Sequence, residues 1–198
     1  MTMARPPRGP FGVPRPATYN PALDYRCPIL AEHKLRSKST ERHKTNSMRL
    51  LDSRRISYEV HEFPSDTHSA EGAAELLGVP ACRVYKTLVV VREKGRPVLV
   101  MVPGDATLDL KLLARSIGDK KLRMASHREA EDITGLEVGG ISALALAGRG
   151  FDVYAHEDML SLPVVYVSAG RRGIDLGLRP SDLLEVTKAK PVAAVGAR

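Results

Sequence analysis

Residues 84–103 read VYKTLVVVREKGRPVLVMVP, and this stretch decides the fold class. It holds two runs rich in β-branched residues, Tyr85 to Arg92 and Pro97 to Pro103, joined by Glu93-Lys94-Gly95-Arg96. A short turn containing glycine between two such runs is typical of a β-hairpin. The length of the apolar runs indicates that both strands are central or nearly so.

The sequence on either side alternates short helices and short strands. Apolar periodicity and capping residues predict helices over residues 45–53, 70–77, 109–117 and 127–133, and a last one from 181 onward. Further strands are predicted over residues 56–63, 121–125, 151–155, 164–168 and 174–178. Strands do not alternate regularly with long helices, which argues against a doubly wound parallel sheet. We predict an α+β fold with a mixed, largely antiparallel sheet surrounded by helices.

Residues 1–43 differ from the rest, because seven of the 14 prolines lie there and no helical or strand period is visible. We predict a disordered or extended arm over 1–43, without a targeting role, and one domain over 44–198. Residues 1–44 carry nine basic and three acidic side chains, a charge of +6, whereas the remainder carries +1. Any nucleic-acid contact by the domain must therefore come from a local patch, although the arm could add weak, salt-sensitive affinity.

Several classes of protein are disfavoured. No apolar run is long enough to cross a membrane, and we expect a cytoplasmic protein. Cys27 and Cys82 are too few for a disulfide scaffold or a cysteine-based zinc site. The six histidines lack metal-ligand spacing, and no phosphate-binding loop or G-x-G-x-x-G is present, so neither a metal nor a cofactor is expected.

Lys86 is the first candidate functional residue, because it begins an apolar strand where a cation needs an anionic partner or a water-filled cavity. It is predicted either to bind a phosphate or carboxylate, or to be an edge lysine whose ammonium reaches solvent.

Two loops are further candidates. Gly139-Gly140-Ile141-Ser142 could present backbone N–H groups to an anion or could simply be a turn. Arg171 and Arg172 lie in a basic turn that could meet phosphates or could be a solvated hairpin tip. Ser142 and Cys82 are conceivable nucleophiles, but neither has an identifiable activating base in the sequence.

Four motifs occur in order along residues 45–190, and together they resemble the YbaK/EbsC family. They are VYKTLVV at 84–90, VPGD with LDLK at 102–111, TG with VGGIS at 134–142, and YVSAGRRG at 166–173. Members are aminoacyl-tRNA deacylases related to the editing domain of bacterial prolyl-tRNA synthetase. The resemblance implies a mixed sheet partly curled into a barrel, and hydrolysis of a wrong amino acid from the tRNA 3′ end. Typical substrates are Cys-tRNA(Pro), and sometimes Ala-tRNA(Pro) or another mischarged species.

The resemblance also implies roles for residues. Lys86 matches the essential lysine that holds the tRNA 3′ end, and Gly139, Gly140 and Ser142 match the loop lining the aminoacyl pocket. Other residues expected to bind substrate are Phe63, Thr87, Ile141, His156, Gly170, Arg171 and Arg172. No protein side chain is the nucleophile in this family: a cysteinyl substrate's own thiol or a positioned water attacks the ester.

Three departures from the family pattern bear on the amino acid removed. Ala143 and Ala145 replace Pro and Gly in the loop, Phe63 stands where Tyr is frequent, and His156 where an acidic residue is common. The first hypothesis is a trans-editing deacylase acting on mischarged tRNA, with prolyl-tRNA synthetase as a conceivable partner. The alternatives are a noncatalytic module that binds tRNA or a synthetase, and a serine or cysteine hydrolase of small esters.

Overall fold

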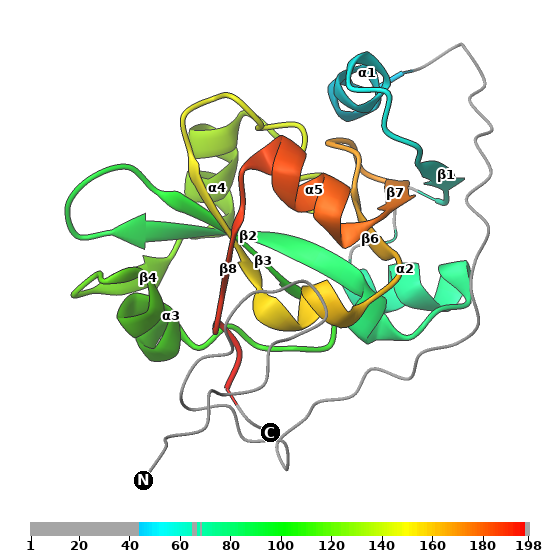
Figure 1. Cartoon of the computed structure of the whole chain (residues 1–198). Helices are drawn as coiled ribbons and strands as arrows, with labels where there is room; N and C mark the ends of the chain where they lie inside the picture. Colours follow the sequence, from blue (N-terminus) through cyan, green and yellow to red (C-terminus); the bar gives the residue numbers. More distant parts are fainter. Residues whose placement is uncertain (1–43, 65–66, 68, 197–198) are drawn as a thin grey trace, which may run out of the picture.

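The computed structural model describes residues 44–64, 67 and 69–196, so the predicted arm over 1–43 lies outside the described residues. Figure 1 shows helices on both sides of a twisted sheet. In chain order the elements are α1 (Asn46–Ser53), β1 (Glu59–Glu62), α2 (Ala70–Leu77), the 3-10 helix η2 (Ala81–Arg83), β2 (Val84–Arg92), β3 (Val98–Pro103), α3 (Leu110–Ile117), β4 (Leu122–Met124), α4 (His127–Thr134), β5 (Asp152–His156), the 3-10 helix η3 (Glu157–Ser161), β6 (Val165–Ser168), β7 (Ile174–Leu178), α5 (Pro180–Thr187) and β8 (Lys190–Val192).

Within the described residues these strands form one sheet in the order β1-β7-β6-β2-β3-β5-β8, with β4 also paired to β2. The pairs β1/β7, β2/β3, β2/β4 and β6/β7 are antiparallel, and β2/β6, β3/β5 and β5/β8 are parallel. The two end strands, β1 and β8, do not pair with each other, so the sheet is not closed into a barrel. The predicted α+β class with a mixed, largely antiparallel sheet is confirmed.

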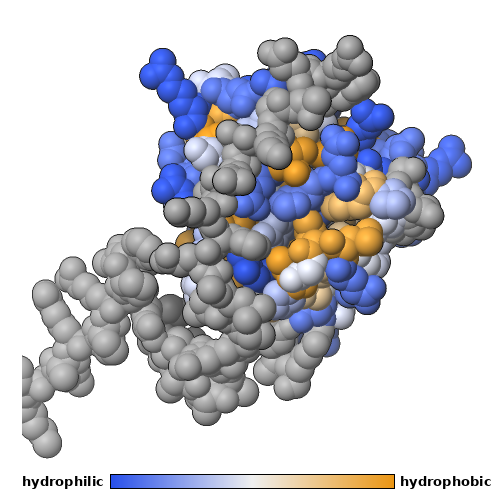
Figure 2. All heavy atoms as spheres, turned by 90° about the vertical axis from the view of Figure 1, so that its right-hand side faces the viewer, coloured by the Kyte–Doolittle hydropathy of each residue, from blue (hydrophilic) through white to orange (hydrophobic). Residues whose placement is uncertain are grey.

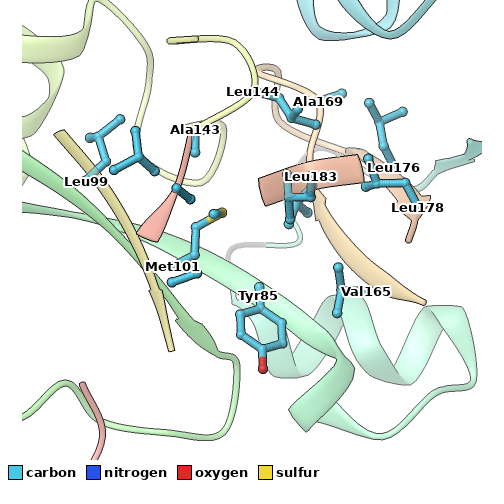
Figure 3. Close-up of a cluster of buried hydrophobic side chains, with 14 of the residues drawn as sticks. Tyr85, Leu99, Met101, Ala143, Leu144, Val165, Ala169, Leu176, Leu178 and Leu183 are labelled. Atoms are coloured by element: carbon cyan, nitrogen blue, oxygen red, sulfur yellow. The ribbon is translucent and has the colours of Figure 1, made fainter. Parts of the chain in front are cut away.

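The predicted hairpin forms the centre of the sheet. All six residues of β3 are buried, as expected for a strand covered on both faces. On one face α1, α4 and α5 cover a core that includes Tyr85, Met101 and Leu183 (Figure 3). On the other face α3 covers Val90, Val98 and Val100, and α2 packs near the start of β2. Two-sided burial explains the nearly continuous apolar sequence of this hairpin.

Helix ends follow the capping residues. The Ser69 hydroxyl accepts from Gly72 N–H at the start of α2, and Gly78 ends the helix with φ of 65°. Ser126 and Glu129 form a reciprocal capping box at the start of α4.

The predicted strand over 56–63 is shorter in the structure, where β1 spans Glu59–Glu62. Strand β8 was not predicted, because its three residues contain Pro191 and lack a strand-like run.

The side of the molecule that carries α2 and β1 is mostly polar (Figure 2). Its apolar side chains form separate patches rather than a continuous band, and Leu76 of α2 is 58% exposed. None of the described helices is both long and apolar enough to span a bilayer.

One edge of β2 is only partly paired. Its first two residues pair with β6, and Val90, Val91 and Arg92 pair with β4. Residues 86–88 lie between these two pairings without a partner strand on that side. Gly104 N–H donates to Val84 O, so the backbone N–H and C=O of Val84 point toward β3. In an antiparallel pair the backbone groups of successive residues point alternately toward and away from the partner strand. The N–H and C=O of Thr87, three residues later, therefore point away from β3. The sheet therefore has a gap beside Lys86, Thr87 and Leu88.

Candidate active site

A pocket of about 430 Å³ opens at the gap beside β2. It is lined by side chains and backbone of β2, α2, the β4–α4 connection and the β6–β7 hairpin. Residues 138–142, which we call the glycine loop, also contribute to it. Its lining is Phe63, Thr67, Ser69, Ala70, Glu71, Ala73, Val84, Tyr85, Lys86, Thr87, Leu88, Val89, Met124, Ala125, Ser126, His127, Ala130, Val138, Gly139, Ile141, Ser168, Gly173 and Asp175.

Lys86 contributes a cation to this pocket. Its Nζ donates to Gly104 O at 2.7 Å, and the side chain is part-buried. No carboxylate among the described residues forms an ion pair with it. A carbonyl oxygen orients the ammonium without neutralising it, so the full positive charge remains available to an anion.

Gly104 is the residue that places this carbonyl. A Cβ atom at position 104 would lie 2.8 Å from Ala70 Cβ and 3.0 Å from Ala81 O. Only glycine allows α2, η2 and the end of β3 to approach each other this closely. Close packing thus explains the glycine of the V-P-G-D motif, and the carbonyl oxygen of this glycine fixes the position of the Lys86 ammonium.

Asp175 contributes a carboxyl to the same pocket. Side-chain alternation puts Asp175 and its register partner Ser168 on the sheet face that carries α2, as it does Lys86. The Asp175 carboxyl is buried and accepts no hydrogen bond from the described residues. Burial raises the pKa of this carboxyl from 3.8 to about 6. The pocket therefore holds a cation and an acid that no described ion pair neutralises.

The glycine loop is held from two sides. Arg172 Nε donates to Val138 O at 2.6 Å, and Glu131 Oε1 accepts from Val138 N–H at 2.9 Å. Gly139 has φ of 91°, and a Cβ at Gly140 would lie 3.0 Å from Arg172 N. The loop therefore packs directly on the backbone of the 171–172 turn, and both glycines are required by geometry.

The loop also supplies free backbone donors. Gly139 and Ile141 line the pocket, and the N–H of neither donates to any described group. Two residues after Ile141, Ala143 donates its N–H to Thr87 Oγ1 at 3.3 Å, which ties the loop to β2. Two backbone N–H groups in a pocket that also holds a cation can stabilise a carbonyl oxygen that gains negative charge.

The structure brings together some of the predicted site residues. Phe63, Lys86, Thr87, Gly139 and Ile141 line the pocket. Gly140, Arg171 and Arg172 lie behind it, where the loop meets the basic turn. Gly170 lies against Ala145, whose Cβ is 2.5 Å from the position a Gly170 Cβ would take. Arg172 thus acts on the loop rather than lining the pocket.

Ser142, His156 and Cys82 are outside the pocket lining. The Ser142 hydroxyl is buried and accepts from Ala145 N–H at 3.5 Å. His156 Nδ1 accepts from Ala194 N–H at 3.3 Å, and Nε2 lies 3.2 Å from Asp158 Oδ2, which anchors the segment after β8. Cys82 is buried and its thiol is not free.

Asp175 and Ser168 are among the pocket residues that were not predicted from the sequence. A signal for Asp175 was present, because it is the one charged residue in the strand Ile174–Leu178. Like Lys86, Asp175 is a charged residue in an apolar strand, where its charge needs a partner or a cavity. No group of three or more His, Cys, Asp or Glu side chains suited to a metal occurs in the described part of the chain.

Comparison with known proteins identifies the family. The model of the Aminoacyl-tRNA editing domain family matches residues 64–186. This chain belongs to that family. The matched range contains all of the pocket-lining residues except Phe63. The resemblance inferred from the four motifs is therefore confirmed.

Individual relatives match different shares of this chain. A protein of Enterococcus faecalis named as a candidate Cys-tRNA(Pro)/Cys-tRNA(Cys) deacylase, EbsC, is 37% identical over 156 residues, covering 78% of this chain and 94% of that protein. The proline–tRNA ligase of Thermodesulfovibrio yellowstonii is 36% identical over 85 residues, covering 42% of this chain and 14% of the ligase. The crystal structure of a candidate trans-editing enzyme for prolyl-tRNA synthetase superposes with a TM-score of 0.67 at 29% identity, covering 76% of this chain and 95% of that one.

The raised pKa of Asp175 predicts a pH-dependent cost to the stability of this editing domain. The folded pKa of about 6 exceeds the ordinary 3.8, so the buried carboxylate destabilises the fold increasingly as pH rises from about 4 to 6 and fully above it. Asp175→Asn should raise the free energy of unfolding at pH 7.5 by up to about 3 kcal/mol and leave it nearly unchanged at pH 4. Urea denaturation at the two pH values measures this, and an equal effect at both would contradict it.

The packing of the glycine loop predicts a second effect. Gly140→Ala should lower the free energy of unfolding by about 1–3 kcal/mol, because the new methyl group meets backbone atoms that cannot move independently. Gly72→Ala is the control, since its Cβ would meet only side-chain atoms, at 3.3 Å or more. Thermal denaturation of both variants tests this, and equal melting temperatures would count against the clash.

Proposed function

We propose that this chain hydrolyses the ester that joins a wrongly attached amino acid to the 3′ end of tRNA. Cys-tRNA(Pro) is the first candidate substrate, and Ala-tRNA(Pro) is a related one. The observation that carries the proposal is that one pocket contains both the Lys86 ammonium and the Asp175 carboxyl, and that neither forms an ion pair with a described residue. An aminoacyl-tRNA end has the complementary charges: phosphates and a free α-ammonium.

Asp175 suits the α-ammonium of the aminoacyl group. A buried carboxylate without a hydrogen-bond donor is unfavourable, and a bound ammonium relieves that cost. Lys86 suits the phosphate or ribose oxygens of the terminal nucleotide, with Gly104 O holding the ammonium in place. The two charges thereby orient the ester from both ends, which is a large part of catalysis in a site without a covalent step.

The chemical step needs no side-chain nucleophile. A water oxygen attacks the ester carbonyl, the carbon–oxygen bond to the ribose breaks, and the ribose oxygen takes a proton, giving a free amino acid and a tRNA hydroxyl. The N–H groups of Gly139 and Ile141 would stabilise the carbonyl oxygen as it becomes an oxyanion. For a cysteinyl substrate, its own thiol can make the first attack: the ribose oxygen leaves with the thiol proton, and water then cleaves the cyclic thioester to give free cysteine.

We expect the amino acid that is removed to be small. Phe63 lines the pocket without the hydroxyl that a tyrosine would add, and Thr87 and Val89 form part of the inner wall. The name of the Enterococcus faecalis relative refers to cysteinyl-tRNA, which supports a small residue as the acyl group that is transferred to water. We expect the protein to act in the cytoplasm, where charged tRNA is made, and contact with prolyl-tRNA synthetase is part of the proposal.

Lys86→Ala should lower the rate of Cys-tRNA(Pro) and Ala-tRNA(Pro) deacylation by roughly 100-fold, because no other described cation lines the pocket. Lys94→Ala, at an exposed residue of the β2–β3 turn, is the matched control and should retain full activity. Release of labelled amino acid measures both. If the unmodified chain binds these tRNAs but does not hydrolyse any of a panel of mischarged species, it is a binding module instead.

The pKa of Asp175 also predicts a pH profile. The carboxylate that holds the substrate ammonium forms as pH rises through about 6 in the free enzyme. After subtraction of spontaneous hydrolysis, kcat/KM should therefore rise through an inflection near pH 6. Asp175→Asn should be slow and should lack that inflection between pH 4.5 and 7. An unchanged inflection in the variant would show that another group titrates.

A further inference from the structure

One segment of the domain has a charge unlike the rest. Residues 111–128 contain six basic side chains and one acidic side chain, a charge of +5. The other residues between 45 and 198 contain fifteen basic and nineteen acidic side chains, a charge of −4. The near-neutral total of the domain is therefore the sum of two opposite parts.

The structure keeps most of these basic side chains available. Exposed cations on α3, on the turn after it and at the start of α4 form no ion pair with any described residue; they are Lys111, Arg115, Lys120, Lys121 and Arg128. The sixth cation, Arg123, is bound to Glu129 of the α4 capping box. Leu113 of α3 is buried against β2 and β3, so Lys111 and Arg115 lie on the outer side of the helix. We call this surface, residues 111–128, the α3–β4 face.

The α3–β4 face leads directly into the pocket. Its last residues, Met124, Ala125, Ser126 and His127, line one side of the pocket. The other side is formed by α2, whose charged residues are Glu71 and Glu75. Figure 1 shows α3 and β4 together at one end of the molecule and α2 at the opposite end. A polyanion with one end in the pocket is therefore attracted by the basic α3–β4 face and repelled by the acidic side chains of α2.

We propose that the α3–β4 face binds the phosphate backbone of the RNA double helix adjoining the 3′ end held in the pocket. This inference rests on the proposed function, since it assigns the path of the same substrate. Contacts of this kind are made to phosphates and not to bases, so the face adds affinity without reading sequence. Each phosphate contact to a duplex contributes about 0.9 to the slope of log affinity against log salt.

The test compares two double variants, each of which replaces two consecutive basic residues by glutamate. The double variant Lys120→Glu with Lys121→Glu changes the α3–β4 face. The double variant Arg54→Glu with Arg55→Glu makes the same change in net charge at the exposed end of α1, far from this face in Figure 1. Both are assayed on full-length Cys-tRNA(Pro) and on a cysteinylated CCA trinucleotide, from about 50 to 200 mM salt, with thermal denaturation as a check of folding.

On full-length tRNA the lysine variant should lose at least about 10-fold in kcat/KM at low salt, and its salt slope should fall by about 2. On the trinucleotide it should stay within about twofold of the unmodified protein, and the arginine variant should do so on both substrates. Equal losses in the two double variants, or an equal loss on both substrates, would overturn the α3–β4 face as the RNA-binding surface.

Failure of the proposed function gives a different result. In that case the unmodified protein hydrolyses neither substrate, whatever the variants do. Binding of uncharged tRNA, measured by fluorescence anisotropy, still tests the face separately: weaker binding by the lysine variant alone supports it, and unchanged binding overturns it.

Discussion

The divergence of β4 and β6 from one edge of β2 is the constraint on which the site depends. Backbone groups of a central strand are normally paired on both sides, and three residues of β2 lack that pairing on one side. The Thr87 hydroxyl, which accepts from Ala143 N–H, partly replaces the missing ladder and draws the glycine loop to the same place. A gap in the sheet therefore becomes a pocket with a defined wall.

The same gap explains how charged groups can occur among apolar strands. Lys86 and Asp175 each lie in a strand whose other residues are largely apolar, and each faces the pocket. Neither forms an ion pair with a described residue. Burial without a partner raises the pKa of Asp175, and the ionised carboxylate lowers the folding stability above pH 6. A carboxyl at this position therefore suits the binding of a cationic ligand better than it suits the stability of the free protein. Such a conflict between local stability and site chemistry is expected where a substrate supplies the missing charge.

Much of the fold was predictable because its signals are local. Ser69, Ser126 and Asp109 are N-caps in the structure, and the turn between β2 and β3 follows from a short polar sequence containing Gly95. The pocket was only partly predictable, because its composition depends on pairings between distant strands. Asp175 reaches the pocket through the β6–β7 hairpin, and Arg172 contacts Val138 across 34 residues. Neither contact follows from a spacing within one motif.

Net charge shows the same limit in another form. A total of +7 suggested a basic protein, yet residues 45–198 carry +1, and within them the charge is divided between a positive segment and a negative remainder. Electrostatic attraction depends on this arrangement rather than on the sum, because exposed charges more than about 8 Å apart are largely screened from each other at physiological salt. A domain of nearly zero net charge has little general affinity for polyanions. One positive face next to the pocket can therefore orient an RNA without holding RNA indiscriminately over the rest of the surface.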